Sequence, residues 1–76
     1  MGDEQIQKTA YLYGRNAEKR RRTDAGTDEE AYREYDALCL SLWRELKEND
    51  AVEDNGNLKA EYALSMEGGR DSVVEY

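Results

Sequence analysis

The sequence predicts a mainly α-helical protein in which an antiparallel pair of helices is covered by a short C-terminal segment. Two observations lead to this fold class. Apolar residues recur with helical spacing over about residues 4–22 and again over about residues 28–48. Between these stretches, Gly26 gives the chain a natural break.

The first helix is predicted from a narrow apolar stripe. Asp3 is in position to cap this helix, and Glu4 suits the positive end of the helix dipole. Two features weaken the prediction: Gly14 disfavours a helix interior, and Tyr11 and Leu12 point away from the stripe. The stripe consists of Ile6, Ala10, Tyr13 and Ala17.

The second helix has the clearest signals in the chain. Thr27 and Glu30 form the pattern of a capping box, in which each side chain accepts a hydrogen bond from the other residue's backbone N–H. An apolar arc of about 140° follows, and the sequence Glu48-Asn49-Asp50 ends the helix. The arc consists of Ala31, Tyr32, Tyr35, Leu38, Cys39, Leu42, Trp43 and Leu46.

The last third of the chain has two readings. Asp54-Asn55-Gly56 is a turn signal. The alternation that follows favours a strand, with Val73-Val74 as the return strand of a hairpin. The absence of β-branched residues over 58–66 favours a short helix, capped by Asn57 and stopped by Gly68-Gly69. The helix is slightly preferred.

Length and composition limit what the protein can do. With 76 residues it is expected to form a single small domain over residues 1–76, with partly mobile ends. There is no His, and the one Cys lies on the apolar arc, so a nucleophile–His pair and a Cys/His zinc site are excluded. The acidic turn over residues 50–57 lacks the first and last ligands of a calcium loop. We therefore expect no enzyme activity, no cofactor and no metal site.

The location is expected to be cytoplasmic, in a bacterial or a host cell. The acidic N-terminus has no apolar run typical of a secretory signal, and no stretch approaches the length of a membrane span. A single cysteine is compatible with a reducing compartment.

Basic residues are concentrated in one block. Residues 8–22 carry a net charge of +5, whereas residues 23–76 carry −10. The block could bind nucleic acid through phosphate contacts, with Tyr11 and Tyr13 available for stacking. Cations at a helix C-terminus also stabilise the helix, and an antiparallel neighbour would place Asp28-Glu29-Glu30 beside them; this structural role is preferred. The candidate nucleic-acid-binding residues are Arg15, Lys19, Arg20, Arg21 and Arg22.

Acidic residues gather on one flank of the second helix, and Arg33, Arg44 and Lys47 lie on the far side. Such a row of carboxylates could be solvated surface, or it could face a basic surface on a partner. Leu40 lies outside the apolar arc, which indicates either a third packed segment or an interface such as a homodimer contact. The candidate partner-binding residues are Glu30, Glu34, Leu40, Trp43, Glu45 and Glu48.

These features favour a non-enzymatic acidic protein that docks on a protein with a basic surface, such as part of a nucleic-acid-binding complex. Small size, acidity and missing catalytic residues are typical of inhibitors that phages and mobile elements direct against nucleic-acid or defence machinery. That is an analogy of type and not of sequence. The alternatives are a nucleic-acid-binding module that uses the basic block and a purely structural homo-oligomer.

Overall fold

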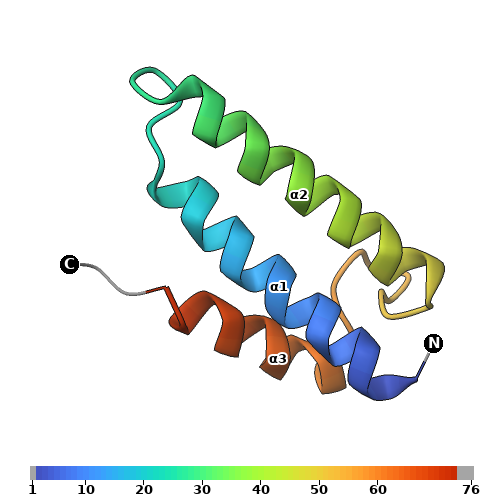
Figure 1. The fold of residues 1–76 in the computed structure, drawn as a ribbon. Coiled ribbons are helices and arrows are strands. Elements are labelled where there is room, and N and C mark those ends of the chain that lie inside the picture. The colour runs from blue at the N-terminus through green and yellow to red at the C-terminus, as the bar shows by residue number, and fades with distance from the viewer. Residues whose placement is uncertain (1, 74–76) are drawn as a thin grey trace.

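The computed structural model describes residues 2–73 and contains three helices: α1 (Asp3–Arg22), α2 (Glu29–Glu48) and α3 (Ala60–Asp71). Helix α1 lies between the other two, with α2 antiparallel to it on one side and α3 on the other (Figure 1). The predicted mainly α fold with an antiparallel helix pair is confirmed. The C-terminal segment is a helix, and no strand is present in the described residues.

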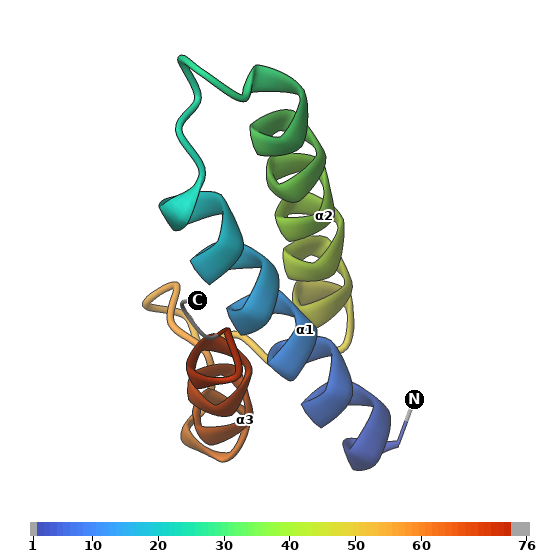
Figure 2. The ribbon, with the colours of Figure 1, turned by 60° about the vertical axis from the view of Figure 1, so that its left-hand side comes forward.

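Helix α3 runs in roughly the same direction as α1. The hydroxyl of Tyr62 near the start of α3 donates a hydrogen bond to Asp3 Oδ1 at the start of α1, 3.2 Å away. At the other end, Arg15 donates to the Ser72 hydroxyl over 2.7 Å. Both α2 and α3 pack on α1, whereas the backbones of α2 and α3 diverge from each other and meet only through side chains of the shared core cluster (Figure 2). The three helices therefore form an open arrangement and not a closed bundle.

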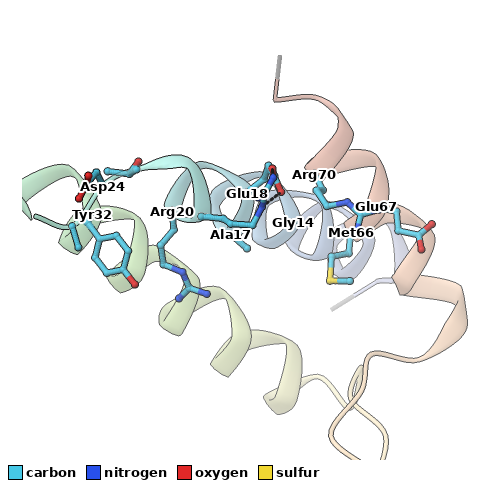
Figure 3. A pocket seen from close by; sticks show the side chains of 12 residues that line it. Gly14, Ala17, Glu18, Arg20, Asp24, Tyr32, Met66, Glu67 and Arg70 are labelled. Carbon is cyan, nitrogen blue, oxygen red and sulfur yellow. Dashed lines mark hydrogen bonds and ion pairs between the residues drawn. The ribbon is translucent and has the colours of Figure 1, made fainter. Parts of the chain in front are cut away.

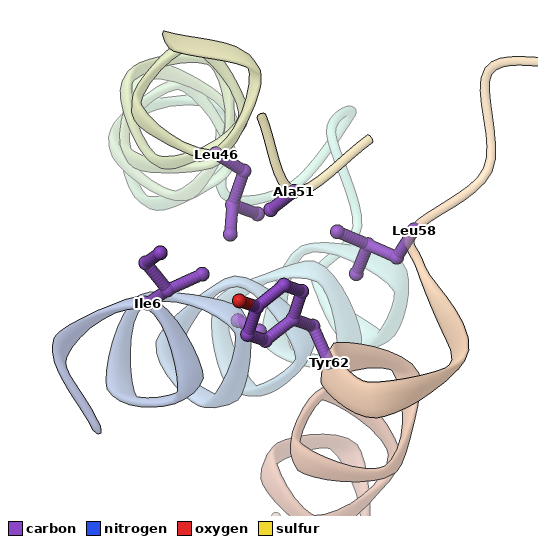
Figure 4. Close-up of a cluster of buried hydrophobic side chains, with 6 residues drawn as sticks. Ile6, Leu46, Ala51, Leu58 and Tyr62 are labelled. Carbon is purple, nitrogen blue, oxygen red and sulfur yellow. The ribbon is translucent and has the colours of Figure 1, made fainter. Parts of the chain in front are cut away.

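The core lies at one end of the molecule, where the connection between α2 and α3 closes the space between these helices. Leu46 of α2 and Tyr62 of α3 both face the first half of α1 there (Figure 4). The connection contributes buried Ala51 and Leu58, and the backbone pairs Val52 with Leu58 around the predicted turn. The buried cluster is Ile6, Ala10, Leu46, Ala51, Leu58 and Tyr62.

The helix caps differ from the sequence prediction. Helix α2 is capped by Asp28, whose side chain accepts from the Ala31 N–H at 3.4 Å, so the predicted Thr27–Glu30 capping box is wrong. Asp28 has a non-helical backbone, with φ of −138° and ψ of 62°, and an Asp in that position offers its carboxylate to the first turn as readily as Thr. Asp3 is not a cap either: Gly2 takes that position, and Asp3 lies inside the first turn of α1.

The ends of α3 also differ from the prediction. The helix begins at Ala60 after Lys59, and Asn57 lies outside it. It continues through Gly68 and Gly69 to Asp71, although glycine is a common helix terminator. The reason is tertiary: Gly69 is buried against the backbone of α1, which holds this turn in the helix.

Candidate functional site

The candidate site lies on the solvent-facing side of α2. We define the acidic flank as Glu30, Glu34, Glu45 and Glu48, of which Glu45 is half-buried and the other three are exposed. No hydrogen bond or ion pair joins any of these four carboxylates to another residue in the range 2–73. Neighbouring charges on the same helix are paired: Arg33 with Glu29, and Asp36 with Arg20. The flank is therefore a row of carboxylates on a regular helix that are not held in ion pairs, although Arg44 and Lys47 lie in the same hollow as Glu48.

Leu38 lies exposed beside the acidic flank, although the predicted apolar arc included it. Its side chain is 48% exposed, and helical geometry places it beside Glu34 and Glu45. The arc of about 140° is wider than one neighbouring helix covers. Because α3 packs on the far side of α1, no second helix covers the Leu38 edge of α2. The width of the predicted arc could have indicated from the sequence that a residue at its edge, such as Leu38, would remain exposed.

Leu40 and Trp43 lie on the opposite edge of α2. Leu40 is 61% exposed, whereas Trp43 is half-buried against the Tyr13 ring, with 5.1 Å between ring centroids. The two form a shallow hollow of about 480 Å³ with Arg44, Lys47 and Glu48. Successive residues of an α-helix are about 100° apart, so Leu40 lies about 120° around the helix from Glu34. The structure therefore does not bring Leu40 together with the central acids of the flank.

The candidate nucleic-acid-binding residues are engaged within the molecule. Arg20 donates to Asp36 at 2.7 Å, two turns beyond the Asp28-Glu29-Glu30 start of α2 that the sequence suggested as its neighbour. The Lys19 ammonium lies 5.9 Å from the centre of the Tyr35 ring, within the range of a cation–π contact. Arg15 binds Ser72, so this part of the block ties α1 to both neighbouring helices.

Arg21 and Arg22 enclose a buried carboxylate. Both donate to Glu18, one turn earlier on α1, and Arg22 does so at 2.9 Å. The side chain of Glu18 is only 6% exposed. The hydrogen bonds from Arg21 and then Arg22 lower the pKa of Glu18 to about 2, because they stabilise its ionised form. Each candidate cation in the basic block thus has at least one contact within the chain.

A groove opens where α2 and α3 diverge. It has a volume of about 670 Å³, and its floor is made by Gly14 and Ala17 of α1 with Met66 of α3 at one side and Tyr32 of α2 at the other (Figure 3). Charges of both signs surround it. The lining cations are Arg20, Arg21 and Arg70, and the lining acids are Glu18, Asp24 and Glu67. Because cations and acids line the groove in equal number, the groove favours neither an anionic nor a cationic ligand.

Cys39 is buried in the contact between α1 and α2. Burial raises the pKa of its thiol, and the nearby Arg20 opposes this shift only in part. A raised pKa keeps the thiol protonated and weakly nucleophilic. Within residues 2–73, no group of three His, Cys, Asp or Glu side chains is arranged to hold a metal ion. In the same range, no helix combines the length and the apolar character that a membrane crossing requires.

Comparison of the chain with protein-family models, with curated proteins and with solved structures found no match.

Proposed function

We propose that this protein is a non-enzymatic binding protein whose acidic flank docks on a basic surface of a macromolecular partner. The observation that carries the proposal is the row of four carboxylates on α2 that form no ion pair or hydrogen bond with another described residue. Nearby acids on the same helix, Glu29 and Asp36, each have an arginine partner. A basic partner would supply the positive charges with which these four carboxylates could pair.

The flank has an energetic reason to bind cations. Like charges four residues apart on a helix, such as Glu30 and Glu34, repel each other by a few tenths of a kcal/mol. A basic surface would convert this repulsion into attraction and would accelerate the encounter through long-range steering. Because α2 is a regular 20-residue helix, the carboxylates are presented in a fixed order.

Charge needs an apolar anchor to give a lasting complex. Leu38 is half-exposed and lies on the same edge of α2 as Glu34 and Glu45, which makes it the natural anchor for the acidic flank. Leu40 and Trp43, the anchors expected from the sequence, lie around the other edge of α2 with Glu48. A partner broad enough to cover the outer side of α2 would contact both edges.

The partner class follows from the chemistry of the flank. Proteins that bind nucleic acids present basic surfaces to phosphates, and a row of carboxylates on a helix offers such a surface an alternative anion. This supports a role of the kind played by phage or mobile-element inhibitors of nucleic-acid or defence machinery, acting in the cytoplasm of a bacterial or host cell.

The experiment begins with capture of bound proteins from a bacterial lysate at low salt, followed by purification of the main retained protein. Its affinity is then measured for the wild type and for a variant with Glu34→Gln, Glu45→Gln and Glu48→Gln. We expect the variant to bind at least about tenfold more weakly, and its affinity to fall less steeply as salt rises. Equal affinity with an equal salt dependence would overturn the proposal.

A matched control removes the same number of charges elsewhere. Glu53→Gln, Asp54→Asn and Glu61→Gln neutralise three exposed acids outside α2. This control has the same net charge as the flank variant, but its acidic flank is intact. It should therefore keep most of the wild-type affinity. An equal loss in both variants would mean that net charge and not the flank attracts the partner.

Two other results would replace the proposal with one of its rivals. Tight binding of bare duplex DNA or RNA at physiological salt, abolished by changing Arg20, Arg21 and Arg22 to Gln, would identify a nucleic-acid-binding module. A melting temperature that rises with protein concentration, with no partner retained from the lysate, would identify a structural homo-oligomer.

A further inference from the structure

The connection between α2 and α3 folds back on itself and has an exposed tip. The backbone pairs Val52 with Leu58. Inside that pair, the Glu53 N–H donates to the Asn57 carbonyl oxygen over 2.7 Å. Residues 53–57 are all exposed, whereas Leu58 belongs to the buried cluster (Figure 4). The tip is therefore open to water at one end and joined to the core at the other.

The geometry of the tip favours attack by the Gly56 backbone nitrogen on Cγ, the side-chain carbonyl carbon of Asn55. The Asn57 N–H donates to Asn55 Oδ1 over 3.0 Å, which withdraws electrons from Cγ and would stabilise negative charge developing on this oxygen. Gly56 has no side chain to obstruct the approach. At the place where its Cβ would lie, no heavy atom of a described, non-adjacent residue comes within 4 Å.

We propose that Asn55 is a site of spontaneous covalent modification, at which the side chain loses ammonia and closes a five-membered ring with the next backbone nitrogen. Hydroxide from the solvent removes the Gly56 amide proton, and the nitrogen forms a bond to Cγ of Asn55. The Cγ–Nδ2 bond breaks, and Nδ2 leaves as ammonia with a proton taken from water, which restores the hydroxide. The product is a cyclic imide, and no other reactant is needed.

Water then opens the ring at one of two bonds. Cleavage between the Gly56 nitrogen and Cγ restores the normal backbone and leaves an aspartate at position 55. Cleavage between the same nitrogen and the backbone carbonyl carbon leaves an isoaspartate, in which the main chain runs through Cβ and Cγ and is one carbon longer. Both products carry an additional negative charge.

One hydrogen bond opposes the reaction. The Gly56 N–H donates to the Glu53 carbonyl oxygen over 2.9 Å, so this bond must open before the proton can leave. The tip is exposed, and exposed backbone hydrogen bonds open locally far more often than those in a core. The pairing of Val52 with Leu58 lies outside residues 53–57, so it does not have to break.

The two products should differ in their effect on the core. The length of a turn fixes the register of its two arms, and an extra main-chain carbon at position 55 changes that length. Leu58, which is 9% exposed, would then be displaced from its place opposite Val52. The aspartate keeps the normal backbone and should leave the core intact. This inference does not depend on the proposed function.

The other three asparagines are controls within the same chain. The side-chain amides of Asn16 and Asn49 donate to carbonyl oxygens one helical turn earlier, at 2.9 and 2.8 Å. These bonds direct both amides away from the backbone nitrogen that follows. Asn57 precedes Leu58, whose branched and buried side chain obstructs attack by its nitrogen. Only Asn55 precedes a glycine.

The first test is incubation of the folded protein at pH 7 and at pH 9, followed by tryptic digestion and mass spectrometry. The peptide of residues 48–59 contains Asn49, Asn55 and Asn57, and that of residues 16–19 contains Asn16. We expect Asn55 to lose ammonia at least about tenfold faster than each of the others, since only its neighbour lacks a side chain. The reaction should be faster at pH 9, and isoaspartate should be among the products. Equal rates at the four asparagines, or an unchanged Asn55, would overturn the proposal.

The second test measures the effect on stability. The isoaspartate form is separated from the aged protein, and its urea unfolding is compared with that of fresh protein and of Asn55→Asp. We expect the isoaspartate form to unfold at lower urea concentration than both. Asn55→Gln, incubated in the same way, should keep its stability. Equal stability of the isoaspartate form and Asn55→Asp would overturn the predicted displacement of Leu58, and an equal loss of stability in aged Asn55→Gln would mean that the change lies elsewhere.

Discussion

Glu18 is an ionisable side chain whose environment differs strongly from that of a free carboxylate. It is a buried carboxylate on an exposed basic stretch, and Arg21 and Arg22 both donate hydrogen bonds to it. A buried charge without such partners would be costly, so the basic block has a local role in making this turn of α1 stable. Glu18, Arg21 and Arg22 thus give a structural role to a stretch of sequence that resembles a nucleic-acid-binding motif.

The pH dependence of stability provides a test of this arrangement. Since the pKa of Glu18 is lowered from its ordinary value of 4.5 to about 2, the folded state binds this proton less readily than the unfolded state. Its contribution to stability is therefore present above about pH 4.5 and is lost as the pH falls towards 2. Urea unfolding from pH 7 to pH 2 should show the wild type more stable than Glu18→Gln at neutral pH, with the gap closing below about pH 4.

Glu29→Gln is the control, because the ion pair of Glu29 with Arg33 is exposed and contributes little. Its stability should follow that of the wild type across the same pH range. A gap between the wild type and Glu18→Gln that stays constant down to pH 2 would contradict the lowered pKa.

Helix α3 depends on a close approach to α1. A Cβ atom added to Gly69 would lie 1.8 Å from the carbonyl oxygen of Tyr11, and one added to Gly14 would lie 1.9 Å from that of Met66. Both distances are far below any contact that a side chain tolerates, so only glycine fits at either position. Gly14, which disfavours α1 as an isolated helix, is thus explained by the packing of α3.

The two adjacent glycines of α3 provide a matched pair of substitutions. Gly69→Ala should destabilise the protein by about 1–3 kcal/mol, because the backbones of α1 and α3 must move apart. Gly68→Ala should not, since its Cβ would meet the Tyr11 ring at an ordinary 3.8 Å, and alanine favours a helix over glycine by up to about 1 kcal/mol. Urea unfolding of both variants measures the difference. Equal effects at the two positions would contradict the close contact.

The whole molecule is packed at one end and open at the other. The buried cluster joins the first half of α1, the last half of α2, the start of α3 and the connection between α2 and α3 (Figure 4). At the opposite end, the first half of α2 contains no buried residue and contacts no helix except α1. Stability is therefore distributed unevenly along α2.

Amide hydrogen exchange should reveal this asymmetry. We expect backbone amides over residues 33–38 to exchange at least about tenfold faster than those over residues 40–47, because the second group lies beside the core. The first turn of α2 is left out of the comparison, since its amides lack helical acceptors in any protein. Equal protection along α2 would show that the open end is held as firmly as the packed end.

The sequence by itself determined the two long helices and part of the face that each buries, such as Ile6 and Ala10 on α1 and Cys39 and Leu46 on α2. Their apolar residues are spaced so that only a helix brings them onto one face. The bounds of α1 and α2 agree with the predicted ranges to within a residue or two. It also located the row of acids on α2, since the positions of residues around a helix follow from their spacing alone. The antiparallel order of these helices follows from the short connection between them.

The tertiary structure decided which of these apolar residues are covered, because coverage depends on where the other helices lie. By packing on the far side of α1, α3 leaves Leu38 exposed on α2 and brings Tyr11 against Gly68 and Gly69. The same contact resolves the ambiguous segment as a helix, since burial of Tyr62 and Gly69 on one face of α3 outweighs the alternating pattern and the weak helix propensity of glycine. The spacing of apolar residues along a helix shows which side chains could be buried on one face. Which of them are buried depends on where the neighbouring helices lie.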